Sequence, residues 1–205
     1  HEWFANNITN KDIADMWIHE SFTAYSESLF LEYYFGKKAG QEYVRGTRKN
    51  ILNDRPIIGP YEVNQSGSGD MYYKGANMLN TLRTLLDDDT LWREILTGIN
   101  KEFYHKTVST EEIESYLSSE SNLDLTVFFD QYLRTTEVPV LEYQIEENTL
   151  SFRYNKALTE FHLPIKVVIN GVKTKIDPKN NWTRISIQNP IKAIDFDSNY
   201  FVHYL

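Results

Sequence analysis

The first residues of the chain have side chains that could bind a metal. His1 and Glu2 are adjacent, as at the start of an HExxH motif, in which two histidines on one helix face bind zinc and the glutamate acts as general base. The second histidine would stand at position 5, where the sequence has Ala5. His1 and Glu2 therefore do not begin this motif.

His1 instead fits the second histidine of an HExxH motif that starts before it. One class of zinc hydrolases takes its third ligand, a glutamate, after a gap of 18 residues, and residues 2–19 form such a gap between His1 and Glu20. A catalytic zinc needs three protein ligands and an open position for water. The spacing predicts His1 and Glu20 as two of these ligands. The alternative is that His1 is a frayed terminal residue and Glu20 a solvated helix residue.

A second carboxylate shares a helix face with Glu20. Glu27 follows it by seven residues, which is two helical turns. Paired carboxylates act as acid and base in glycosidases, and this chemistry is one alternative for the pair. Glu27 could equally support a neighbouring site residue or have a structural role in a helix bundle.

Ordered segments along the chain resemble one enzyme family. Residues 3–6 (WFAN) and 17–25 (WIHESFTAY) resemble the segments H-Q-W-F-G-N and W-L-N-E-G-F-A-x-Y of the aminopeptidase N type of gluzincin metallopeptidase, family M-one. Residues 72–76 (YYKGA) are similar to its Y-E-K-G segment. Residues 129–133 (FDQYL) and 138–140 (VPV) resemble the end of its helical catalytic domain and the entry into a β domain.

The chain departs from the family pattern at a few positions. Glu2 stands where many members have Gln, Ala5 and Ser21 replace Gly, and His19 replaces Asn immediately before Glu20. None of these changes removes a ligand or a catalytic group. An imidazole at position 19 could support the site or bind metal adventitiously.

The resemblance implies a zinc-dependent aminopeptidase that hydrolyses N-terminal residues from peptides through a metal-activated water. His1 and Glu20 would bind the zinc, and Tyr72 would be the catalytic tyrosine, whose phenol donates to the oxyanion. The first histidine and the general-base glutamate would lie upstream, so the 205-residue chain alone is expected to be inactive. Its expected partners are peptides with a free N-terminus and the upstream part of the same polypeptide. The alternative is a non-catalytic helical and β-sandwich module for binding or scaffolding.

Helical spacing dominates the first two thirds of the chain. A loop at 54–70, rich in Gly and Ser near its end, separates the second and third of six predicted helices: 10–35, 41–52, 71–86, 90–104, 110–118 and 125–133. Thr9 and Asp12 have the spacing of a capping box for the first helix, and Ser109 and Glu112 have it for the fifth.

From Pro139 onward, apolar and polar residues alternate. Five short segments are typical of β-strands: 140–145, 150–154, 163–169, 172–176 and 184–187. Asn170-Gly171 predicts a two-residue hairpin between two of them, because both central positions of such a turn need positive φ. The expected fold class is α+β: a mainly helical half-domain of a metallopeptidase at 1–137, truncated at its N-terminus, followed by a small antiparallel β-sandwich domain at 138–205.

Composition and charge exclude several kinds of protein. The net charge of −8 comes entirely from residues 1–135 and argues against a nucleic-acid partner. The absence of cysteine excludes disulfides and thiolate metal sites. No run of apolar residues reaches the ~18 of a membrane span. Some bacterial members of the family are exported, but no signal region is present in the sequence, which therefore predicts no compartment.

Overall fold

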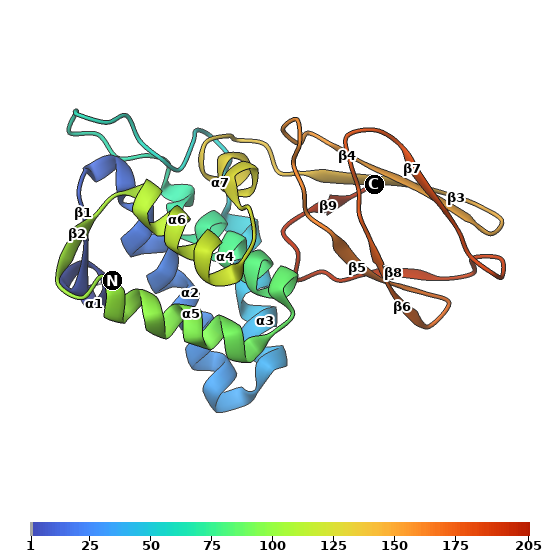
Figure 1. The fold of residues 1–205 in the computed structure, drawn as a ribbon, viewed down its shortest axis with the longest axis horizontal. Coiled ribbons are helices and arrows are strands. Elements are labelled where there is room, and N and C mark those ends of the chain that lie inside the picture. The colour runs from blue at the N-terminus through green and yellow to red at the C-terminus, as the bar shows by residue number, and fades with distance from the viewer. Residues whose placement is uncertain (1) are drawn as a thin grey trace.

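The computed structural model describes residues 2–205, without the side chain of Trp3, and confirms the α+β class (Figure 1). The helical part runs to residue 133. Its seven helices are α1 (Glu2–Asn7), α2 (Trp17–Phe35), α3 (Lys37–Gly46), α4 (Tyr73–Leu86), α5 (Asp89–Glu102), α6 (Thr110–Ser121) and α7 (Thr126–Leu133). Short 3-10 turns precede or follow three of them: η1 (Ile13–Asp15), η2 (Thr47–Asn50) and η3 (Gly69–Met71).

The start predicted for the first long helix is wrong. Residues 8–10 form strand β1 (Ile8–Asn10), which pairs in parallel with β2 (Lys106–Val108). Asp12 caps the turn η1 by accepting from the Ala14 N–H (2.9 Å), so it makes no capping box with Thr9. The helix begins only at Trp17, because residues 8–10 pair with β2 and residues 13–15 form the turn η1.

The strands after residue 139 form two sheets. The first has the order β7-β4-β3-β9 and the second β6-β5-β8. Their bounds are β3 (Val140–Glu146), β4 (Thr149–Asn155), β5 (Ile165–Ile169), β6 (Val172–Ile176), β7 (Thr183–Ser186), β8 (Ile194–Phe196) and β9 (His203–Tyr204). The hairpin at Asn170-Gly171 is confirmed, with φ of 50° and 82°. Neighbouring strands are antiparallel except β3 and β9, which pair in parallel.

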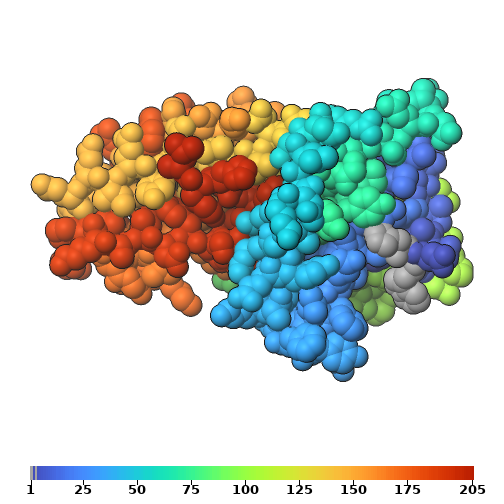
Figure 2. All heavy atoms as spheres, turned by 180° about the vertical axis from the view of Figure 1, so that it is seen from behind, coloured from blue at the N-terminus to red at the C-terminus, as the bar shows by residue number. Residues whose placement is uncertain are grey.

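The C-terminal residues connect the two sheets to the helices. The Tyr132 hydroxyl on α7 donates to the Phe201 carbonyl (2.8 Å), and the Phe201 N–H donates to Thr81 Oγ1 on α4 (2.8 Å). Arg48 of η2 donates to the backbone carbonyls of Asn199 and Tyr200. Figure 2 shows the last residues of the chain (red) lying against the segment that contains η2. One hydrophobic core extends through both parts.

No helix in the described range 2–205 has both the length and the apolar character that crossing a membrane requires.

Candidate active site

The structure brings together Glu20 and Tyr72, which the sequence analysis selected from two distant segments. Glu20 lies in the first turn of α2 and is 8% exposed, and Tyr72 lies between η3 and α4, partly buried against the core. Glu20 acts on the pKa of Tyr72 and Tyr72 on that of Glu20, so the two side chains lie within reach of one another. A carboxylate and a phenol therefore meet where α2 and α4 pack together.

Their contact shifts both ionisations. Burial raises the pKa of Glu20, although the charge of His19 and the hydrogen bond from Tyr72 act to lower it. Burial raises the pKa of Tyr72, and the charge of Glu20 raises it further. The phenol is consequently protonated at neutral pH and available as a hydrogen-bond donor.

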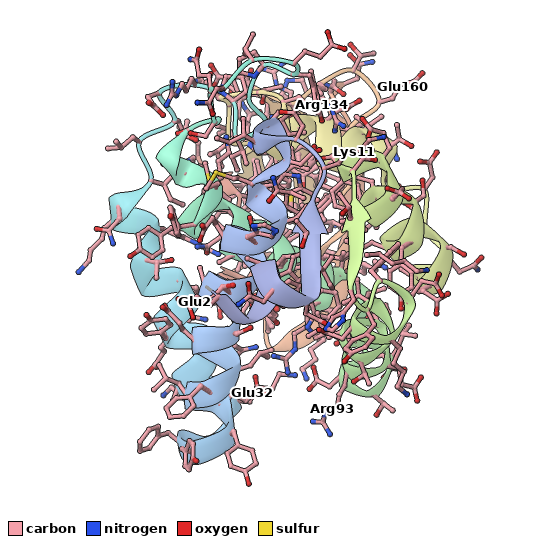
Figure 3. The ribbon with its side chains drawn as sticks, turned by 90° about the vertical axis from the view of Figure 1, so that its left-hand side faces the viewer. Glu2, Lys11, Glu32, Arg93, Arg134 and Glu160 are labelled. Atoms are coloured by element: carbon pink, nitrogen blue, oxygen red, sulfur yellow. The ribbon has the colours of Figure 1, made fainter. Side chains whose placement is uncertain are left out.

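The start of α2 is held by a buried tryptophan. Trp17 is fully buried and donates from Nε1 to Thr110 Oγ1 on α6 (2.8 Å). Phe22 stacks on Trp17 and also on Phe4 of α1, whose ring centroid lies 5.1 Å away. These contacts fix the rotation of α2 about its axis, and therefore the direction of Glu20. Figure 3 shows α1, marked by Glu2, beside α2, which carries Glu32 further along.

The backbone before Tyr72 is held from two sides. The buried Asp70 carboxylate accepts from the Leu52 N–H (2.9 Å) and the Asn53 N–H (2.6 Å). On the other side, Ser21 Oγ donates to the Met71 carbonyl (2.6 Å). These hydrogen bonds fix the end of the 51–68 loop and place Tyr72 at the start of α4.

A glycine lets that loop fold back on itself. A Cβ at Gly67 would lie 1.7 Å from the Ile57 carbonyl oxygen, a distance that no side chain can adopt. Only glycine permits the two limbs of the loop to approach so closely.

His19 is turned toward β1 and away from a role as metal ligand. Its Nε2 accepts from the Asn10 N–H (3.0 Å), which occupies the lone pair that a metal would need. Burial lowers the pKa of His19, while a hydrogen bond to the Ile8 backbone and the charge of Glu20 raise it. The side chain therefore anchors β1 to α2.

Glu27 is likewise engaged elsewhere. It accepts from the Tyr43 hydroxyl on α3 (2.6 Å), and this contact, with burial, raises the pKa of Tyr43 to about 12. The Glu27 carboxylate thus connects α2 to α3, which is the structural alternative that the sequence left open.

The structure describes only one of the two predicted metal ligands. They contain no group of three His, Cys, Asp or Glu side chains that could hold a metal ion. Glu20 has the chemistry of one ligand, because a cation would offset the cost of burying its carboxylate charge. His1, the other predicted ligand, lies outside the described residues.

Comparison with known proteins decides the family. Residues 1–132 match the model of the Peptidase family M1 domain. The chain belongs to peptidase family M1. The resemblance inferred from the sequence is confirmed, and a peptidase family removes the glycosidase alternative for Glu20 and Glu27.

Relatives of this M1 chain are aminopeptidases of much greater length. It is 19% identical to probable aminopeptidase 1 of Sulfurisphaera tokodaii over 97% of this chain and 28% of that protein. It is 26% identical to aminopeptidase N of Lactococcus lactis over 92% of this chain and 25% of that protein. The M1 chain thus spans about a quarter of the length of these relatives.

A solved structure shares the fold. The crystal structure of Legionella pneumophila aminopeptidase A in complex with aspartic acid superposes with a TM-score of 0.72 at 18% sequence identity. The match covers 100% of this M1 chain and 26% of that protein. The helical part and the following sheets therefore share the fold of part of that structure.

Sequence reasoning missed the side chains that hold the candidate site in place. Asp70 has no recognisable motif, because its partners are backbone amides at Leu52 and Asn53. In the sequence, Ser21 is only a departure from a family glycine. The signal that could have identified its role is the glycine at position 75, which the structure places against it.

Proposed function

We propose that this chain is the downstream part of the catalytic domain of a zinc-dependent aminopeptidase. The observation that carries the proposal is that the Glu20 and Tyr72 side chains lie within reach of one another. The two residues come from separate segments that resemble the family pattern, and both would have to lie at one site. Residues 1–137 would belong to the catalytic domain and residues 138–205 to a small β-sandwich domain.

Each residue has a defined task in this proposal. Glu20 and His1 would hold the zinc, together with a histidine from the upstream part of the polypeptide. The zinc would supply Lewis-acid polarisation of the scissile carbonyl. Tyr72 would donate a hydrogen bond to the carbonyl oxygen as negative charge develops there.

The substrates would be peptides with a free N-terminus. Residues 1–135 carry an excess of acidic side chains that accounts for the net charge of −8. A negative field of this kind attracts a cationic amino terminus. The 205-residue chain alone would be inactive, because it lacks the first histidine and the general base.

The test compares two polypeptides on fluorogenic aminoacyl amides, with and without a metal chelator. The polypeptide that carries H-E-x-x directly before His1 should release the fluorophore, the chelator should abolish release, and the 205-residue chain should show none. Failure of the longer polypeptide on every substrate would contradict the proposal and favour a non-catalytic binding or scaffold module.

Tyr72→Phe tests the role of the phenol in the longer polypeptide. Removal of one oxyanion donor should lower kcat by about 10²–10³-fold, with little change in KM. The neighbouring Tyr73→Phe is the matched control and should leave kcat close to the original value. Equal losses for both variants would argue against a specific role for Tyr72.

A further inference from the structure

Ser21 links the two residues of the candidate site through the backbone. It follows Glu20 in α2, is fully buried, and donates from Oγ to the carbonyl of Met71, the residue before Tyr72. The O···O distance is 2.6 Å. The hydrogen bond therefore joins the immediate neighbours of Glu20 and Tyr72 across two elements.

This hydroxyl behaves differently from the others on the same helix. Serine and threonine in a helix usually donate to a carbonyl of the preceding turn. Three residues of α2 follow that rule: Thr23 donates to the His19 carbonyl, Ser26 to the Phe22 carbonyl and Ser28 to the Tyr25 carbonyl. Ser21 instead donates across to η3.

The shape of α4 holds the Ser21 side chain in this orientation. A Cβ at Gly75 would lie 1.8 Å from Ser21 Oγ and 2.6 Å from Ser21 Cβ. The serine side chain therefore fills the space that the glycine leaves on α4. Because the Ser21 side chain packs directly on Gly75, its hydroxyl is directed toward the Met71 carbonyl.

We propose that Ser21 is a positioning residue, whose hydroxyl ties η3 to α2 and holds the Tyr72 phenol against Glu20. The proposal rests on the function proposed above for Tyr72. The family pattern has a glycine at this position. A glycine could not make the hydrogen bond to the Met71 carbonyl, so this hydrogen bond is specific to sequences with serine here. Asp70 fixes the same segment only to residues 52 and 53, whereas Ser21 fixes it to the helix of Glu20.

The first experiment measures kcat and KM of the longer polypeptide on a fluorogenic aminoacyl amide. Ser21→Ala should lower kcat about tenfold, which corresponds to 1.4 kcal/mol, and leave KM nearly unchanged. In a Tyr72→Phe background the same substitution should have no further effect on kcat. An equal loss in both backgrounds would show that Ser21 acts independently of Tyr72 and would overturn the proposal.

Ser28→Ala is the matched control for these measurements. Ser28 is also buried on α2, but it donates within its own helix. Its replacement should leave kcat unchanged. Ser21→Gly, which restores the family residue, should reproduce the effect of Ser21→Ala.

A second experiment uses ¹⁹F NMR of the 205-residue chain to monitor the surroundings of the Tyr72 ring, and it requires no enzymatic activity. With 3-fluorotyrosine at position 72, Ser21→Ala should shift or broaden the ¹⁹F resonance, and Ser28→Ala should not. An unchanged resonance in Ser21→Ala would overturn the positioning role. A changed resonance together with an inactive longer polypeptide would instead contradict the proposed function and leave the tie itself standing.

Discussion

Lys74 is a fully buried cation two residues after Tyr72. Its Nζ donates to the Thr135 carbonyl (2.8 Å), and burial lowers its pKa to about 8 against the raising effect of Asp70 and Glu137. The unfolded chain, with an ordinary lysine pKa of about 10.4, binds more protons than the folded chain between these values. The contribution of Lys74 therefore makes the free energy of unfolding rise with pH over this interval. Below the interval, the buried Lys74 destabilises the fold by its full amount.

Replacing Lys74 tests this dependence on pH. As pH rises from 7.5 to 9.5, the free energy of unfolding of the original chain should increase relative to that of Lys74→Met. The expected change is on the order of 2 kcal/mol, measured by urea unfolding. The exposed Lys106→Met should show no such trend. A difference that stays constant over this range would contradict the predicted pKa.

At the scale of elements, the site depends on how closely α2 and α4 approach. Ser21 and Gly75 face one another at the point of contact, where one helix supplies a small side chain and the other supplies none. The same approach sets the separation of Glu20 from Tyr72. The packing of two helices thus determines the geometry of the candidate site.

A pair of substitutions tests this complementarity. Gly75→Ala should reduce the free energy of unfolding by about 1–3 kcal/mol, because its new Cβ would overlap the Ser21 side chain. In a Ser21→Gly background the new Cβ would meet the Cα of residue 21 at 3.5 Å, which is an ordinary contact. The cost of Gly75→Ala should then largely disappear in denaturant unfolding. Additive effects of the two substitutions would contradict this account of the packing.

At the scale of the whole molecule, the helices and sheets share a core and should unfold together. Tyr132 is fully buried on α7 and donates to the Phe201 carbonyl beside the sheets. Phe201 is held in turn by Thr81 on α4. Loss of these hydrogen bonds would therefore destabilise both the helical part and the sheets.

Tyr132→Phe tests whether the parts are coupled. It leaves the Phe201 carbonyl without this donor and should lower the free energy of unfolding by about 1–2 kcal/mol. Calorimetry should show one transition at lower temperature in the variant, as in the original chain. The exposed Tyr33→Phe should leave Tm unchanged. Two separate transitions would show that the sheets and the helices unfold independently.

Much of the fold followed from local patterns. The change from helical spacing to alternation near Pro139, the hairpin at Asn170-Gly171 and the capping box at Ser109 and Glu112 are all present in the structure. Strands β8 and β9 were not predicted, because they are three and two residues long and have no periodicity to recognise.

The sequence alone identified Glu20 and Tyr72 as candidate site residues, and the order of the matching segments indicated the family. Only the tertiary structure decided that these two side chains meet, that β1 interrupts the predicted helix, and that His19 is turned toward β1. The physical reason is the range of the interactions. The pattern of apolar residues that predicts a helix or strand lies within a short stretch of sequence. The Ser21 hydrogen bond and the β1–β2 pairing instead join residues far apart in the chain, and they form only once the helices have packed.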